Sequence, residues 1–344
     1  MLRFNNDYNH TAHDKVLEAV MSSRNESFTG YGEDEWCGAA ADMIRKVTAC
    51  DEAAVYFLPG ATQVNFIVCA AALRPIESII CADSGHIFCH EAGSVENTGH
   101  KITALPGCDG KITAAQIAEE ASKYYDDGEK EYLTKPGMVY ISFSTEWGTI
   151  YSREEIAAIS EVCKRYGMLL FVDGARMGYG LGADGNDMTL RDFAELADVF
   201  YIGGTKCGAM FGEALVIVNR QLQPGFRSYM KQKGAVLAKG WLMGLQFCTL
   251  LQDGLYFEIT KRADEAAVRI REAFRQKDIP LYVESPTNQQ FVLLTDDQKA
   301  VLEEKYIFEF MARTPDNLNC VRFCTGWNTT AEEVKQLIDD IGRL

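Results

Sequence analysis

The fold class is decided by the stretch LLFVDGAR at residues 169–176, where four apolar residues precede an acid, two small residues and a base. An apolar run without alternation is typical of a strand buried on both faces of a parallel sheet. In open α/β sheets, ligands bind at the carboxyl ends of such strands, where Asp173 lies. A buried Asp173 needs a cationic partner, and Arg176 and the protonated ring nitrogen of a cofactor are both candidates.

Similar runs recur along the first two thirds of the chain. They occupy residues 53–58, 78–81, 138–142, 168–173, 199–202 and 214–218. Helical patterns separate several of them, and the clearest runs from Glu154 to Tyr166, with Ser152 as its N-cap and Gly167 after its end. This alternation predicts an α/β domain with a mainly parallel sheet.

After Pro224 the pattern changes. Helical stretches at about 233–252 and 254–277 lead into strands at 289–295 and 320–324 and a final helix from Thr330. We therefore predict an N-terminal arm over residues 1–30, a large domain over 31–249 and a smaller C-terminal α+β domain over 250–344. The arm is polar and aperiodic, and we expect it to cross the surface or a partner subunit.

Composition narrows the class of protein. With 344 residues, 47% hydrophobic and 24% charged, the chain has the profile of a folded globular protein. A net charge of −15 without any basic run argues against nucleic-acid binding. The apolar runs fall far short of the roughly 20 residues that span a bilayer. The first residues lack a signal peptide, so we expect neither membrane binding nor export.

The eleven cysteines are an odd number and contain no C-x-x-C pair. We expect them to be free thiols in the cytoplasm, without a disulfide framework or a metal site.

Two further segments could carry chemistry. Residues 57–63, FLPGATQ, end a strand in small residues and begin a helix, which suits a phosphate but is also ordinary turn chemistry. Residues 199–208, VFYIGGTKCG, place Lys206 among glycines. A lysine in a tight, desolvated pocket has a lowered pKa and can form a Schiff base with an aldehyde, whereas most lysines are solvated surface charges.

The three segments, in this order, resemble the pyridoxal-phosphate enzymes of the aspartate-aminotransferase fold, fold type I. More narrowly, the chain is similar to the threonine aldolase branch of the β-eliminating lyases. The similarity runs over nearly the whole length. It also includes YGED at 31–34, LPGATQVN at 58–65, His86 ahead of EAG at 91–93, and VRF at 321–323.

This resemblance implies how pyridoxal 5'-phosphate is held. Lys206 is expected to form the Schiff base, and Asp173 to keep the pyridine nitrogen protonated. His86 is expected on the face of the ring. The segment Gly60, Ala61 and Thr62 is expected at the phosphate.

The resemblance also implies the substrate contacts. Arg322 and Arg176 are expected at the substrate carboxylate or, for Arg176, at the phenolic side of the cofactor, because a guanidinium matches two oxygens at once. Relatives commonly carry Ser-Asp-Thr where this chain has Asn6-Asp7-Tyr8, and Asn6 can still bind a carboxylate. At the phosphate, relatives usually read Thr-Gly-Thr instead of Gly60-Ala61-Thr62.

A third departure concerns the catalytic base. Many relatives carry Asn-Thr-His where this chain reads STEWG at residues 144–148, which puts Glu146 in the stretch of the histidine. The candidates for the base are therefore His86, Glu146 or a water molecule between them. Burial beside Trp147 would raise the pKa of Glu146 above its ordinary value of about 4.3. Alternatively, Glu146 only caps the turn at Gly148.

The resemblance implies an aldolase that cleaves a β-hydroxy-α-amino acid, threonine or allo-threonine by default, to glycine and an aldehyde. A β-eliminating lyase or an aminotransferase acting on another small amino acid is the alternative. A catalytically idle pyridoxal-phosphate-binding protein is a third hypothesis. The family also implies a homodimer or homotetramer with shared active sites.

Overall fold

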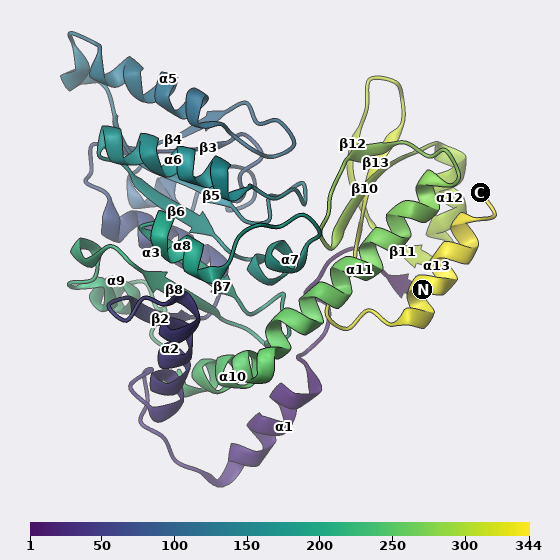
Figure 1. The fold of residues 1–344 in the computed structure, drawn as a ribbon, viewed down its shortest axis with the longest axis horizontal. Helices are drawn as coiled ribbons and strands as arrows, with labels where there is room; N and C mark the ends of the chain where they lie inside the picture. The colour runs from purple at the N-terminus through teal and green to yellow at the C-terminus, as the bar shows by residue number, and fades with distance from the viewer.

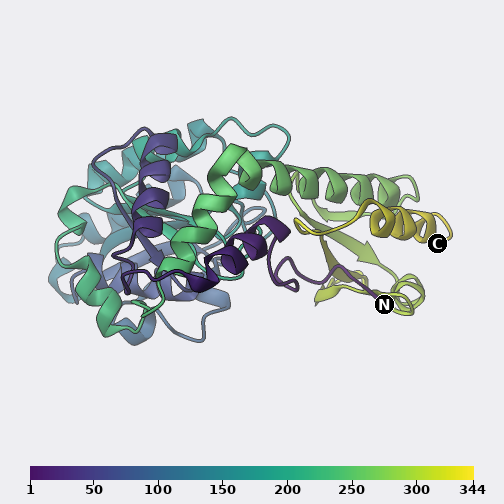
Figure 2. The same cartoon turned by 90° about the horizontal axis from the view of Figure 1, so that it is seen from below.

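The computed structural model describes all 344 residues. Figures 1 and 2 show a large lobe around a twisted sheet and a smaller lobe beside it, with the long helix α11 (Leu255–Arg275) running from one lobe into the other. Both ends of the chain lie on the smaller lobe. None of the helices combines the length and the apolar character that crossing a membrane requires.

Seven strands form the sheet of the large lobe, in the order β2-β8-β7-β6-β5-β3-β4. They are β2 (Ala54–Leu58), β3 (Glu77–Ala82), β4 (Ile102–Leu105), β5 (Lys135–Ser142), β6 (Leu169–Asp173), β7 (Val199–Gly203) and β8 (Glu213–Ile217). Strand β8 runs antiparallel to both of its neighbours, and the other pairs are parallel. The predicted mainly parallel α/β sheet is thus confirmed.

Helices cover both faces of this sheet. They are α1 (Asp14–Ser22), α2 (Glu35–Thr48), α3 (Ala61–Ala72), α4 (His86–Cys89), α5 (Ala114–Tyr125), α6 (Arg153–Tyr166), α7 (Met177–Gly182), α8 (Leu190–Leu196), α9 (Phe226–Gln232) and α10 (Trp241–Leu251). Side chains of α2, α6, α8 and α10 share one hydrophobic core with one face of the sheet, and those of α3 and α9 share a second core with the other. The strands supply both cores because successive side chains point to opposite faces.

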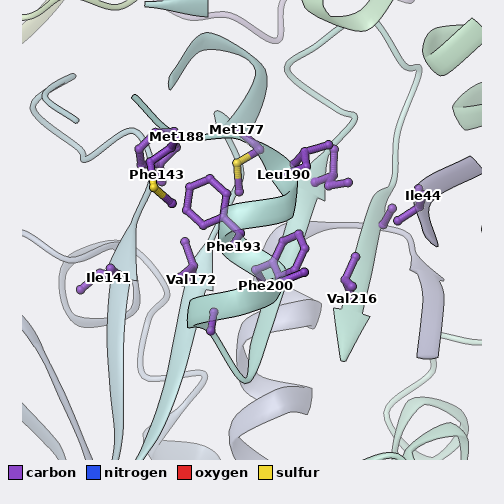
Figure 3. Packing of buried hydrophobic residues seen from close by; sticks show 14 of the residues in the cluster. Ile44, Ile141, Phe143, Val172, Met177, Met188, Leu190, Phe193, Phe200 and Val216 are labelled. Atoms are coloured by element: carbon purple, nitrogen blue, oxygen red, sulfur yellow. The ribbon is translucent and has the colours of Figure 1, made fainter. Parts of the chain in front are cut away.

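Aromatic packing ties α8 to the sheet in the first core. Figure 3 shows Phe193 of α8 between Phe143, which follows β5, and Phe200 of β7. The ring centroids of Phe193 lie 4.8 Å from those of Phe143 and 6.0 Å from those of Phe200. Burying such rings removes much apolar area from water, so this core fixes the carboxyl ends of β5 to β7.

The smaller lobe is built on an antiparallel sheet of order β12-β13-β10-β9. Its strands are β9 (Leu281–Val283), β10 (Gln289–Leu294), β12 (Glu309–Arg313) and β13 (Asn319–Cys324), and its other helices are α12 (Asp296–Glu303) and α13 (Ala331–Ile341). A third core lies between this sheet, α11 and α13. The separate C-terminal α+β unit is therefore present, whereas the boundaries at residues 31 and 250 stay a prediction.

The arm is more structured than its polar sequence predicts. Strand β1 (Leu2–Arg3) pairs in parallel with β11 (Tyr306–Ile307), and Phe4 is buried in the third core. Helix α1 follows with Val16 buried, so this polar segment contains a strand and a helix, while its contact with a partner subunit stays a prediction. The expected helix from about 233 also begins later, at Trp241, because Gly234 adopts a positive φ of 77° that ends the preceding turn.

Candidate active site

A pocket opens at the carboxyl edge of the large sheet. Ser142 ends β5, Asp173 ends β6, and Lys206 follows the end of β7 by three residues. The pocket is lined by Ala61, His86, Ser142, Ser144, Glu146, Asp173, Ala175, Arg176, Tyr201 and Lys206. The structure thus brings together most of the predicted site residues, although Gly60, Thr62, Asn6 and Arg322 are not among those that line it.

Close backbone packing holds β7, which leads to Lys206, against the segment that follows β6. A Cβ on Gly174 would lie 1.7 Å from the Tyr201 carbonyl oxygen, and one on Gly203 would lie 2.4 Å from that of Ala175. Only glycine fits at both positions, so the segment after β6 can lie directly against β7. As a result, Lys206 is half-buried beside Asp173. Burial lowers the pKa of Lys206, and the charge of Arg176 lowers it further.

Asp173 is buried and well supplied with hydrogen bonds. Its Oδ1 accepts from the Ala175 backbone N–H at 2.9 Å, and its Oδ2 accepts from Asn65 Nδ2 at 3.2 Å and from the Tyr140 hydroxyl. Arg176 does not pair with it, so this candidate cation is excluded. A protonated ring nitrogen remains the candidate partner.

A chain of polar side chains connects Asp173 to His86. Asn65 Nδ2 also donates to Glu91 Oε1 at 2.7 Å, and the same oxygen lies 2.9 Å from His86 Nδ1. Ser94 donates to the other oxygen of Glu91 at 2.6 Å. Because Nδ1 faces Glu91, the other ring nitrogen of His86 stays free for the pocket. Sequence reasoning missed Asn65 and Glu91, although a buried asparagine within the apolar helix α3 is a visible signal.

Glu146 is anchored by one oxygen. Its Oε1 accepts from the Ser142 hydroxyl at 2.6 Å and from the His86 backbone N–H at 2.9 Å. Its Oε2 accepts no hydrogen bond from another residue. Burial raises the pKa of Glu146, in spite of the hydrogen bond from Ser142, and the negative charge of Asp173 raises it further. The Gly148 N–H is instead bound to the Thr145 carbonyl, so Glu146 does not cap that turn.

Arg176 is held by the N-terminal arm. Its Nε donates to Asp7 Oδ2 at 2.7 Å and its Nη2 to Asp7 Oδ1 at 3.0 Å. Asn288 Nδ2 donates to the same carboxylate at 2.9 Å. By contrast, Asn6 only accepts from the Tyr8 backbone N–H at 3.1 Å. In this segment Asp7, which sequence reasoning passed over, makes the long-range contact.

Arg322 lies on β13 of the smaller sheet. Its Nη1 donates to Gln289 Oε1 at 3.2 Å and its Nη2 to the Asn5 carbonyl at 2.9 Å, while its buried Nε has no partner. Its charge reaches His90, whose pKa is lowered by burial first, then by His86 and Arg322. The unpaired N–H of Arg322 is suited to a carboxylate.

The residues present fit pyridoxal phosphate. Helix α3 begins at Gly60 without a side-chain cap, so the N–H groups of its first turn, from Ala61 on, are available for a phosphate. Tyr201 lines the pocket with a buried hydroxyl that has no partner in the chain. A buried polar group is normally hydrogen-bonded, so this hydroxyl indicates that a polar ligand belongs here.

Comparisons with known proteins agree with this geometry. The sequence model described as Beta-eliminating lyase matches residues 14–305. A low-specificity L-threonine aldolase from a Pseudomonas species is 30% identical over 320 residues, which cover 90% of this chain and 88% of the relative.

Solved structures are similar to this chain as well. The Leishmania major threonine aldolase superimposes with a TM-score of 0.97 at 38% identity, covering 100% of this chain and 99% of the other. The aspartate aminotransferase of Thermus thermophilus has a TM-score of 0.73 at 13% identity, covering 100% and 91% of the two chains, which shows a shared fold.

Proposed function

The chain belongs to the β-eliminating lyase family, and from that premise we propose that it is a pyridoxal-phosphate-dependent aldolase that cleaves a β-hydroxy-α-amino acid to glycine and an aldehyde. Threonine and allo-threonine are the default substrates, since relatives at 30% and 38% identity are named threonine aldolases. The observation that carries the proposal is the placement of Glu146, with one free oxygen, in the same pocket as Lys206 and Asp173.

The cofactor would be held by residues on three strand ends. Lys206 would bind its aldehyde carbon, Asp173 its ring nitrogen and the first turn of α3 its phosphate, with His86 against the ring face. Bound there, the ring would accept the electron pair released when the Cα–Cβ bond breaks. Tyr140 and Asn65 hold Asp173 in place for this contact.

The base must remove the proton of the β-hydroxyl. We assign this step to Glu146 Oε2, because its Oε1 is anchored and its raised pKa makes it a stronger base than an exposed carboxylate. The substrate carboxylate would meet the free Nε of Arg322. Arg176 would face the same carboxylate only with the part of its guanidinium that Asp7 leaves free.

Product analysis tests the proposal. The purified protein is incubated with L-threonine, L-allo-threonine, L-serine and phenylserine, and the products are identified by mass. Glycine with an aldehyde supports the aldolase. A 2-oxo acid that has lost the β-hydroxyl, released together with ammonia (pyruvate from serine, 2-oxobutanoate from threonine), indicates the β-eliminating alternative. A 2-oxo acid that keeps the β-hydroxyl, formed without ammonia and only when a second 2-oxo acid is added as amino acceptor, indicates transamination. A protein that binds the cofactor but converts none of these substrates would support the catalytically idle alternative.

We further propose a homo-oligomer, a dimer or a tetramer, with shared active sites. In support, Tyr31, Met21 and Tyr229 are exposed large hydrophobic residues, and Lys231 Nζ lies 4.8 Å from the centre of the Tyr31 ring. Cationic and aromatic groups at this surface suit a neighbour's active site. Sedimentation at assay concentration tests the idea, and a fully active monomer would contradict it.

We also propose that the protein works in the cytoplasm. All eleven cysteines are free and most are buried, which suits a reducing compartment. Alkylation in fresh lysate, followed by mass spectrometry, is expected to find every accessible thiol reduced.

A further inference from the structure

Glu213 is a buried carboxylate that the proposed reaction does not use. It begins β8, where it lies opposite Gly203 of β7 on one side and Leu58 of β2 on the other. Only 2% of its surface is exposed. Burying a carboxylate costs free energy unless the carboxylate is paired. The burial of Glu213, at the sheet edge where β7 ends, therefore needs an explanation.

Its two oxygens hold the two residues directly before Lys206. Oε2 accepts from the Gly204 backbone N–H at 2.9 Å, and Oε1 accepts from Thr205 Oγ1 at 2.6 Å. Thr205 Oγ1 in turn accepts from the Gly212 N–H at 3.0 Å. The Gly204 N–H also lies 3.1 Å from the Gly212 carbonyl oxygen, so the carboxylate shares this donor with the backbone and binds the Thr205 hydroxyl with its other oxygen.

The loop itself leaves little freedom. A Cβ on Gly204 would lie 2.6 Å from the Gly212 carbonyl oxygen, so the two ends of the loop touch. Beside this contact, Glu213 accepts hydrogen bonds from both Gly204 and Thr205. It therefore fixes the backbone that leads to Lys206. In Glu213→Gln one carboxylate oxygen becomes an N–H₂ group, which cannot accept from Gly204 or Thr205, so the side chain keeps only one of its two hydrogen bonds to this segment.

We infer that Glu213 is a positioning residue that fixes the Gly204–Thr205 backbone before Lys206 and supplies a negative charge to the Lys206 ammonium. The inference rests on the proposed function for the role of Lys206 as the cofactor lysine. The hydrogen bonds and the charge are, however, properties of the chain alone.

The electrostatics support this role. Burial raises the pKa of Glu213 to about 7, although Thr205, Gly204 and Lys206 all act in the other direction. The negative charge of Glu213 in turn raises the pKa of Lys206, which burial lowers overall. The other charged groups that act on this pair are Asp7, Asp173 and Arg176. Tyr201, Cys207 and Tyr256 also lie near Glu213, and burial together with its negative charge raises their pKa, so they are neutral.

The test measures the titration of Lys206 in Glu213→Gln. In the full-length chain stripped of cofactor, trace acetylation read by mass spectrometry gives the pH midpoint of the Lys206 amine. Losing the negative charge of Glu213 should shift this midpoint down, and each pH unit of that shift raises labelling below both midpoints about tenfold. In the loaded protein, the pH midpoint of the absorption band should fall in the same direction.

Matched variants separate this effect from general damage. Glu77→Gln removes another buried carboxylate of the same sheet, one paired with Lys135, and should leave the Lys206 midpoint unchanged. Glu213→Asp keeps the charge but shortens the reach, so its midpoint should stay near that of the wild type while turnover falls. If Glu213→Gln does not fold, Thr205→Val serves instead, since it removes the two hydrogen bonds of the Thr205 hydroxyl and keeps the carboxylate of Glu213; its midpoint should also stay unchanged while turnover falls.

Two results would overturn the inference. One is a wild-type Lys206 midpoint in Glu213→Gln, and the other is full turnover in both Glu213→Asp and Thr205→Val. The first result does not depend on which reaction the protein catalyses, because the labelling experiment contains no substrate. The second is measured with whichever substrate the wild type converts. Failure of the proposed aldolase activity would instead appear in the product analysis of the wild type.

Discussion

Arg176 and Asp7 form a buried, bidentate ion pair although they are 169 residues apart in the sequence. Asp7 belongs to the N-terminal arm and Arg176 to the segment after β6, so this contact fastens the arm over the pocket. Burial alone would raise the pKa of Asp7, but Arg176 and Lys206 outweigh it and lower the pKa to about 2. Burial would lower the pKa of Arg176, and Asp7 reverses that effect.

Asp7→Ala should therefore be strongly destabilising. Removing one partner of a buried pair leaves the other charge uncompensated, which costs about 3–5 kcal/mol in the free energy of unfolding. In the wild type, the pair stabilises the fold above the ordinary pKa of an aspartate, about 3.9, and this stability is lost as the pH falls toward 2. Denaturant unfolding between pH 2 and pH 7 measures both effects.

Asp42→Ala is the matched control, because its pair with Arg45 is largely exposed. Exposed pairs contribute about 0–1 kcal/mol, so this variant should unfold almost like the wild type. Equal losses in the two variants would show that the buried pair has no special role.

The sequence predicts the position of Lys206 and Asp173 well, because both follow apolar strands and parallel strands end at one edge of a sheet. It does not predict the contacts of Asp7 or Glu213. An acid near the start of the chain has no local pattern to distinguish it from a solvated one. Its partner, Arg176, becomes visible only when the arm is folded back across the pocket.

The sequence also does not predict which of the neighbouring residues Asn6 and Asp7 faces the site. Asn6 was expected to donate a hydrogen bond to the substrate carboxylate. In the structure its side-chain oxygen instead accepts from the Tyr8 backbone N–H. Which of two adjacent polar residues faces a site depends on the backbone path, and the path here is set by β1 pairing with β11 in the smaller lobe. That pairing joins distant segments, and single-sequence patterns carry no information about it.

Gly174→Ala should disrupt the site by collision with the Tyr201 carbonyl oxygen. The added Cβ would lie 1.7 Å from that oxygen, so the segment after β6 and strand β7 must separate. We expect a loss of at least about 3 kcal/mol in stability, at the upper end for overpacked positions, together with loss of cofactor binding. Gly128→Ala is the control, because nothing lies within 4 Å of its Cβ position and its φ is not positive. A Gly174→Ala protein with wild-type melting and absorbance would contradict the close approach.

Asn65→Leu should uncouple Asp173 from Glu91. The variant keeps a side chain of similar size but removes the N–H₂ group that donates to both carboxylates. Two buried acceptors then lose a partner, at about 1–3 kcal/mol each. We expect weaker cofactor binding, measured by titration of the absorption band. Ser94→Ala removes a donor from Glu91 alone and should leave the affinity nearly unchanged. If Ser94→Ala weakens binding as much as Asn65→Leu, the link to Asp173 is not the cause.

Glu146→Gln decides which group is the base. A base must be ionised, so a carboxylate with a raised pKa gives a rate that falls as the pH drops through that pKa. The amide cannot ionise, and we expect it to lower kcat/KM for L-threonine by about a hundredfold or more and to abolish this acidic limb. His86→Phe keeps a ring against the cofactor face and loses the contact with Glu91, so its rate should fall while its acidic limb stays. Glu96→Gln, at an exposed carboxylate, should behave like the wild type. If Glu146→Gln retains full turnover and the same acidic limb while His86→Phe loses that limb, the base is His86 or a water molecule that it holds.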